Sequence, residues 1–138
     1  MMSICSGALI SSRHVLTAAH CVIDFDGEQY ADVCEREEEF RAYGRTRDPS
    51  GFFVYLGSKC SVPSMCNYPH KAAKILVHEH WGKCDSSNDL AIIELAHGAD
   101  PKEAYPICMP ISDTKLTETL KAAGIGSDRK FLVFRMYS

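Results

Sequence analysis

Two neighbouring runs of sequence decide the fold: Cys5-Ser6-Gly7-Ala8-Leu9-Ile10 and Val15-Leu16-Thr17-Ala18-Ala19-His20-Cys21. Residues 5–10 and 15–19 are expected to be short extended runs, and Ser11-Ser12-Arg13-His14 between them predicts a turn. The small residues that flank the histidine would bring its imidazole to a surface cleft, above a backbone clamped by the cysteines that begin and end this stretch. Such a bridge would close about 17 residues and contribute on the order of 3 kcal/mol.

Apolar runs farther along the chain predict additional short strands. They lie at residues 52–56, 74–78 and 90–95. A weakly helical stretch follows at 114–122, and a last apolar run occupies 131–134. Several short strands with turn signals and few helices indicate an all-β barrel or sandwich.

The segment 24–48 differs in composition from the strands on either side of it. It holds nine acidic and four basic residues, which is a local charge of −5. This predicts a solvated surface insertion, with one or two helical turns in residues 32–43. Glu35, Glu37, Glu38 and Glu39 fit a solvated loop. Alternatively, these glutamates would form an acidic rim beside His20, and their negative electrostatic potential would favour basic substrates or partners.

Composition excludes several classes of protein. The 138 residues are 46% hydrophobic and carry a formal net charge of −3, which is typical of one globular domain and not of a disordered chain. No basic stripe indicates nucleic-acid binding, and no run of about 18 apolar residues predicts a membrane span. Seven cysteines indicate an oxidising, extracellular setting. The first residues show no secretion signal, so we expect the chain to start late.

Asp89 lies at the entrance of the apolar run 90–95. A carboxylate in that position is suited to accept a hydrogen bond from Nδ1–H of a histidine such as His20. The bond would set the tautomer of the imidazole and stabilise its protonated form. Spacing alone leaves a simpler alternative open, a surface histidine and a turn-capping aspartate.

The sequence around these two residues resembles the chymotrypsin/trypsin-like serine protease family. The resemblance implies that His20 is the general base and that Asp89 is its orienting partner. The matching words are the two runs quoted first and, later in the chain, Asn88-Asp89-Leu90-Ala91-Ile92-Ile93-Glu94-Leu95.

The resemblance covers roughly residues 3–126 and implies an incomplete all-β fold. It corresponds to the first Greek-key β-barrel of a trypsin-like double-barrel fold, with the first strand and the second barrel missing. Residues 1–126 would form a partial protease domain, and 127–138 would be a tail that does not resemble the family. Softer matches are Val54-Tyr55-Leu56-Gly57, Pro106-Ile107-Cys108-Met109-Pro110 and Ala123-Gly124-Ile125-Gly126.

The family's nucleophilic serine has no counterpart in the sequence. No Gly-Asp-Ser-Gly-Gly word occurs, and Ser112, Ser127 and Ser138 stand in ordinary loop or tail sequence. We therefore expect a serine endopeptidase domain, directed at protein or peptide substrates, that is inactive as this chain alone. The alternative is a secreted non-catalytic module that binds as a protease-like decoy.

Six of the seven cysteines are expected to form disulfides. The resemblance implies one bond beside the catalytic histidine, and the spacing around Pro63 indicates a second. A third would join the acidic insertion to the segment before Asp89, a connectivity that sequence leaves open. Cys108 would be unpaired; in the family a cysteine at this position often bonds a propeptide or a light chain, which is missing here. The pairs are, in that order, Cys5–Cys21, Cys60–Cys66 and Cys34–Cys84.

A group of histidines offers a metal-binding alternative. His78 and His80, with His70 and Cys84 nearby, suggest zinc ligands by residue type. Both rings of a His-x-His strand point to one face, but no third ligand has convincing spacing. We expect ordinary loop histidines here, and neither a metal nor a cofactor in the protein.

Overall fold

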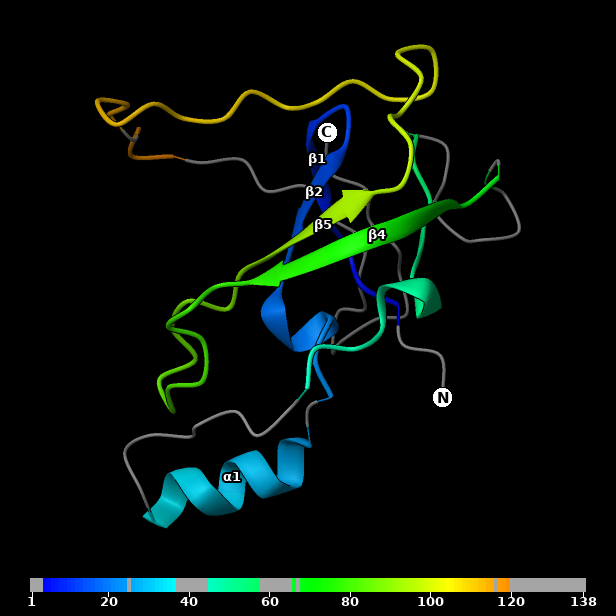
Figure 1. Cartoon of the computed structure of the whole chain (residues 1–138). Helices are drawn as coiled ribbons and strands as arrows, with labels where there is room; N and C mark the ends of the chain where they lie inside the picture. The colour runs from blue at the N-terminus through cyan, green and yellow to red at the C-terminus, as the bar shows by residue number, and fades with distance from the viewer. Residues whose placement is uncertain are drawn as a thin grey trace, which may run out of the picture. The chain divides into compact units, whose positions relative to one another are not determined.

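A computed structural model describes residues 4–24, 26–36, 45–57, 66, 68–115 and 117–119 (Figure 1). Contacts divide the chain into two units, Met1–Ile107 and Cys108–Ser138, and the regular elements that the structure describes belong to the first. No helix among the described residues combines the length and apolar character needed to cross a membrane. The elements are β1 (Ala8–Ser11), β2 (His14–Thr17), η1 (Ala19–Cys21), α1 (Gly27–Arg36), η2 (Pro49–Gly51), β3 (Phe53–Val54), β4 (His70–Val77) and β5 (Ala91–Leu95).

The strands form an antiparallel sheet in the order β1-β2-β5-β4-β3. The pairing of β2 with β5 joins two strands that lie far apart in the sequence (Figure 1). Thr17 at the end of β2 faces Ala91 at the start of β5. Because the strands are antiparallel, the residues that follow β2 lie beside the residues that precede β5. This pairing therefore brings the segment after Thr17 and the segment before Ala91 to the same end of the sheet.

One face of the sheet carries the hydrophobic core. Along β5 the residues alternate between buried and half-buried, as expected for a strand with one face toward the core. Among the residues that the structure describes, Leu95 and Val22 are the largest completely buried side chains. The buried set consists of Leu9, Val15, Ala19, Val22, Ile23, Ala72, Ala91, Ile93, Leu95 and Ala99.

Strand boundaries differ from the sequence predictions at β3 and β4. β3 covers Phe53–Val54 instead of 52–56, because within the described residues its two positions pair with His70 and Lys71 at the start of β4. Gly57, with φ of 103°, then turns the chain away from the strand direction. β4 begins at His70 rather than at residue 74, since it pairs with β3 at its start and with β5 farther along.

Two predictions near the C-terminus fall largely outside the described residues. The apolar run 131–134 lies there entirely. Of the weakly helical stretch 114–122, the structure describes residues 114, 115 and 117–119, and these form no helix.

Helix α1 begins at Gly27, earlier than the helical turns predicted within 32–43. The carboxylate of Asp26 accepts hydrogen bonds from the backbone N–H groups of Glu28 and Gln29 at 3.0 and 3.1 Å. These bonds satisfy donors that the first turn of a helix leaves unpaired, so Asp26 caps the helix and sets its start. No residue of α1 is buried, which agrees with a solvated insertion. Residues 37–44, with Glu37, Glu38 and Glu39, lie outside the described ranges.

Candidate active site

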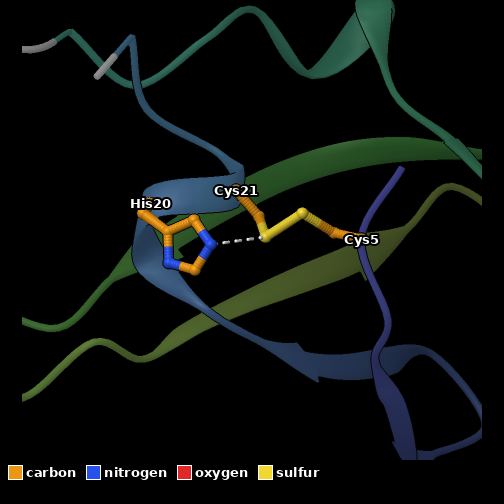
Figure 2. A group of neighbouring side chains, drawn as sticks. All are labelled: Cys5, His20 and Cys21. Atoms are coloured by element: carbon orange, nitrogen blue, oxygen red, sulfur yellow. Dashed lines mark hydrogen bonds between the residues drawn. A yellow bond between two sulfur atoms is a disulfide. The ribbon is translucent and has the colours of Figure 1, made fainter. Parts of the chain in front are cut away.

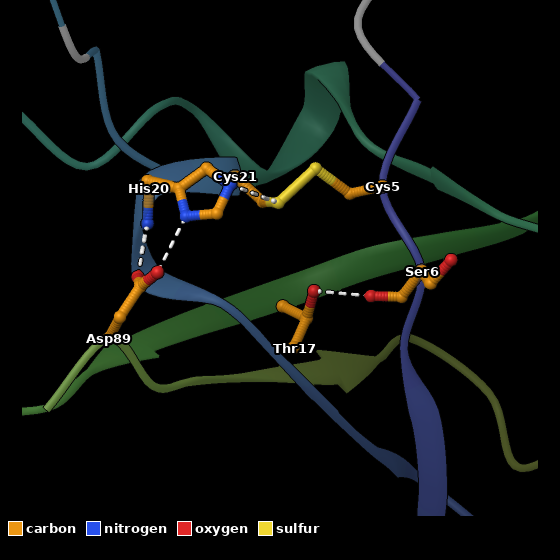
Figure 3. The surroundings of a disulfide bond; sticks show 6 residues. All are labelled: Cys5, Ser6, Thr17, His20, Cys21 and Asp89. Atoms are coloured by element: carbon orange, nitrogen blue, oxygen red, sulfur yellow. Dashed lines mark hydrogen bonds and ion pairs between the residues drawn. A yellow bond between two sulfur atoms is a disulfide. The ribbon is translucent and has the colours of Figure 1, made fainter. Parts of the chain in front are cut away.

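His20 and Asp89 meet at the end of the sheet where β2 and β5 pair. His20 lies in the 3₁₀ turn η1, directly after β2, and Asp89 lies just before β5. The Nδ1 atom of His20 is 2.6 Å from Oδ2 of Asp89, and the backbone N–H of His20 donates to Oδ1 at 2.9 Å (Figure 3). Both oxygens of the carboxylate are therefore engaged by one residue, which fixes the orientation of the imidazole.

The backbone that leads into Asp89 is held in a rarely used conformation. Ser86 and Asn88 have φ angles of 57° and 59°, in the left-handed region that few non-glycine residues adopt. The carboxylate of Asp85 accepts the backbone N–H of Ser87 at 2.8 Å. This bond, with a further one from the Ser87 side chain, holds the pKa of Asp85 below its usual value. A turn stabilised in this way delivers Asp89 to the start of β5.

Helix α1 is fastened to this same turn at two points. One is the disulfide Cys34–Cys84, the pairing that the sequence left open. The other is the hydroxyl of Tyr30, which donates to the carbonyl of Lys83 at 3.2 Å and lies 3.1 Å from Oγ of Ser86. No sequence signal points to Tyr30, because its partners lie more than fifty positions away.

The second disulfide of the site lies beside His20. Cys5 and Cys21 are bonded, as the family resemblance implies. The hydroxyl of Thr17 donates to the carbonyl of Ser6 at 2.9 Å and ties the strand entering η1 to the segment that carries Cys5 (Figure 3). The Nε2 atom of His20, opposite the atom that faces Asp89, lies 3.5 Å from Sγ of Cys21 (Figure 2).

This geometry suits a side chain that exchanges protons. A carboxylate that accepts Nδ1–H selects the neutral tautomer with its lone pair on Nε2, and it stabilises the ring once Nε2 is protonated. The side chain of His20 is 51% exposed, so a bound molecule can reach the ring. An oriented, accessible imidazole with a fixed carboxylate partner is the usual arrangement for general acid–base chemistry.

The remaining cysteines of the predicted set fall in different places. Cys66 is disulfide-bonded, whereas Cys60 lies outside the described residues, so their pairing stays a prediction. Cys108 is free and exposed. It belongs to the unit Cys108–Ser138, whereas His20 belongs to the unit Met1–Ile107.

The histidines considered as zinc ligands do not come together as a donor cluster among the described residues. The Nε2 atom of His70 lies 2.8 Å from a carboxylate oxygen of Glu103, and Cys84 is bonded to Cys34. His78 and His80 do lie near each other, with ring centroids 5.7 Å apart, and the backbone N–H of His80 donates to Nδ1 of His78. Their sequence proximity accounts for this contact.

Sequence comparison identifies the group of proteins to which these features belong. A sequence model of the trypsin family matches residues 2–135, nearly the whole chain. The chain belongs to the trypsin family of serine proteases. The match to this family continues past residue 126 and includes most of the segment 127–138.

Individual trypsin-family relatives show the same relationship. Phenoloxidase-activating factor 3 of Holotrichia diomphalia is 36% identical over 132 residues, which are 89% of this chain and 34% of that protein. Serine protease grass of Drosophila melanogaster is 32% identical over 80% of this chain and 27% of that protein. Kallikrein 1-related peptidase b11 of Mus musculus is 30% identical over 90% of this chain and 42% of that protein. The chain spans less than half the length of each of these relatives.

The trypsin-like fold is also found by comparison of structures. The crystal structure of scabies mite inactivated protease paralogue S-D1 matches 93% of this chain and 46% of that chain, with a TM-score of 0.52 and 21% identity. At this identity the likeness concerns the fold. Together with the antiparallel sheet, it confirms the expected all-β fold, an incomplete trypsin-like barrel.

Proposed function

We propose that His20 and Asp89 are the general base and the orienting carboxylate of a serine endopeptidase triad, directed at protein or peptide substrates. The observation that carries the proposal is the double contact between these residues, 2.6 Å from Nδ1 to Oδ2 and 2.9 Å from the backbone nitrogen to Oδ1. In peptide-bond hydrolysis by acyl transfer, the Nε2 atom of the histidine takes the proton of an attacking serine and later returns it to the leaving amine. The carboxylate stabilises the imidazolium formed in between.

We also propose that these 138 residues do not hydrolyse peptides by themselves. No Gly-Asp-Ser-Gly-Gly word occurs in the sequence. Ser112 is an exposed residue whose hydroxyl donates to a carboxylate oxygen of Asp113 at 3.5 Å, and residues 108–138 contain no histidine that could act as its general base. Since removing the nucleophile of a triad costs about 10⁶-fold in kcat, an oriented histidine and aspartate alone would not sustain turnover.

Covalent labelling with a fluorophosphonate probe tests the missing nucleophile. The probe reacts with activated serines, so we expect no stoichiometric adduct on this chain, while a complete trypsin-family protease in the same reaction is fully labelled. A stoichiometric adduct would contradict the proposal. Repeating the reaction with Ser112→Ala would then show whether that residue is the nucleophile.

A second candidate function is a secreted, non-catalytic module that binds as a protease-like decoy. It is favoured by the combination of a trypsin-like sheet with the absent nucleophile word. The mass of the product isolated from its natural source separates the candidates. A product well above 15.3 kDa that reacts with the probe supports the endopeptidase, whereas an unreactive 15.3 kDa product supports the module.

We also propose that the protein is extracellular and that Cys108 forms a disulfide with a separate polypeptide. Two disulfides in the described residues support an oxidising compartment. The exposed, free thiol of Cys108 is available for a bond to a separate propeptide or light chain. The domain end at residue 126 remains a prediction from the sequence.

A further inference from the structure

The disulfide next to His20 places a sulfur atom within reach of a catalytic-type histidine. Sγ of Cys21 lies 3.5 Å from Nε2 of His20, and the other ring nitrogen is held by Asp89 at 2.6 Å (Figure 3). The imidazole of His20 therefore contacts the sulfur with one ring nitrogen and the carboxylate with the other. A disulfide sulfur carries no proton, so the contact at Nε2 is a hydrogen bond only when that nitrogen is protonated.

The two sulfur-bearing residues differ in their accessibility. Cys5 is exposed, whereas Cys21 is half-buried and faces the imidazole (Figure 2). In thiol–disulfide exchange, the attacking thiolate needs access to one sulfur, and the reaction is faster when the other sulfur leaves as a stabilised thiolate. Exposure favours attack on Cys5. A neighbouring imidazolium favours the departure of Cys21, because it stabilises the negative charge that develops on sulfur.

We propose that the Cys5–Cys21 disulfide is a directional exchange site for small thiols, with Cys5 as the modified residue and Cys21 as the released thiolate. The thiolate of a small monothiol attacks Sγ of Cys5 and forms a new sulfur–sulfur bond. The bond between Cys5 and Cys21 breaks, and its electron pair goes to Sγ of Cys21. The proton lost by the incoming thiol ends on Nε2 of His20. No other oxidant or reductant is required.

The product of this exchange contains a Cys–His–Asp arrangement. The released thiolate of Cys21 forms an ion pair with the protonated ring of His20, whose other nitrogen still donates to Asp89. A thiolate paired in this way is a nucleophile toward soft electrophiles. The inference needs no serine nucleophile, so it stands independently of the proposed endopeptidase function.

The direction of exchange is tested on the folded chain with glutathione as the monothiol. A Cys108→Ser background removes the free thiol, and the products are trapped with iodoacetamide and located by peptide mass mapping. We expect glutathione on Cys5, carbamidomethyl on Cys21, and an unmodified Cys34–Cys84 bond, whose two residues are both half-buried. Adducts mainly on Cys21, or faster opening of Cys34–Cys84, would overturn the proposal.

The role of His20 is tested in the same assay. We expect His20→Ala to slow the appearance of the Cys5 adduct about tenfold, as a consequence of a less stabilised leaving thiolate. His97→Ala, which removes an exposed histidine away from the site, is the matched control and should leave the rate unchanged. Equal rates in the wild type and His20→Ala would show that the imidazole does not assist.

A second variant keeps the proposal testable if exchange on the wild type is too slow to follow. Cys5→Ser in the Cys108→Ser background leaves Cys21 as a thiol without any reduction step. We expect iodoacetamide to alkylate Cys21 at pH 6.5 about tenfold faster than in the same protein carrying His20→Ala. The same alkylation rate with and without His20, in variants with matching circular dichroism spectra, would contradict the pairing.

Discussion

At the scale of the residue, Gly7 shows how closely the chain approaches itself beside the site. A Cβ added there would lie 2.8 Å from Cγ1 of Val15 and 2.9 Å from the carbonyl oxygen of Leu16. Real Cβ atoms do not tolerate such contacts with backbone, so the segment between Cys5 and β1 can run against β2 only with glycine at this position.

We predict that Gly7→Ala destabilises the protein by about 1–3 kcal/mol, because the inserted methyl group forces a shift of β2 or of the segment before β1. Gly51→Ala is the control, since a Cβ at Gly51 meets nothing within 4 Å. Urea unfolding followed by circular dichroism measures both. Equal midpoints for the two variants would show that the close approach is relieved without cost.

A second prediction at this scale concerns the tautomer of His20. In Asp89→Asn, the amide can donate to Nδ1 where the carboxylate accepts from it. We expect the neutral ring to change from the Nδ1–H to the Nε2–H form, as read from ¹⁵N chemical shifts of the imidazole. Glu79→Gln serves as the control, because Glu79 pairs with His80 on the surface. An unchanged tautomer in Asp89→Asn would rule out orientation by the carboxylate.

At the scale of the element, helix α1 depends on its attachments more than on a core. It has no buried residue, and its contacts to the turn before Asp89 include the Cys34–Cys84 bond and the hydroxyl of Tyr30. A disulfide that closes a loop of this size stabilises by about 4 kcal/mol in the chain-entropy model. The helix and the turn that carries Asp89 are therefore expected to gain or lose order together.

We predict that the double variant Cys34→Ser/Cys84→Ser loses hydrogen-exchange protection in α1 and in the turn 83–88, while β5 stays protected. The reason is that the strands have their own inter-strand hydrogen-bond ladder, whereas no residue of the helix is buried. Mass spectrometry of deuterated peptides reports each segment. Unaltered protection in α1 would mean that the helix is stabilised by other contacts.

Strand β5 is the element on which the sheet depends, since it lies between β2 and β4. We predict that Leu95→Ala, at a position with no exposed surface, costs about 2–5 kcal/mol through lost burial and the cavity left behind. Leu76→Ala on β4 removes the same atoms from a side chain that is 46% exposed, and it should cost at most about 1 kcal/mol. Chemical denaturation checks both values, and equal losses would contradict this placement of the core.

At the scale of the whole molecule, the exposed apolar side chains decide how the isolated chain behaves. Large exposed apolar surfaces favour association, and the outer strands of a sheet, which in the described residues are β1 and β3, are where another chain can pair. Within the described part of the unit Met1–Ile107, several large apolar residues are more than half exposed: Ile4, Phe53, Tyr68, Tyr105 and Ile107.

We therefore predict that the purified 138-residue chain self-associates at micromolar concentration, and that added salt increases the association by screening its net charge of −3. Sedimentation velocity at several concentrations measures this. A soluble monomer that unfolds cooperatively would contradict the prediction and favour the non-catalytic module described above.

Local sequence patterns predicted the elements whose secondary structure depends mainly on neighbouring residues. The apolar runs predicted the positions of β1, β2 and β5, with ends that differ from the observed ones by up to three residues, because side chains alternate along a strand. The predicted start of the helix, within residues 32–43, was wrong. The N-cap of α1 is Asp26, which lies in an acidic stretch whose overall charge suggested a solvated loop. Tyr30 carried no signal, because its role depends on residues brought near by folding.

The sequence by itself determined the class of fold and the identity of the candidate residues, since short strands and characteristic words are local properties of the chain. Only the tertiary structure decided that a histidine and an aspartate 69 positions apart share two hydrogen-bonded contacts, and that the same imidazole touches a disulfide sulfur. The physical reason is the antiparallel pairing of β2 with β5. It brings the end of one strand beside the start of the other, a proximity that no pattern within either strand encodes.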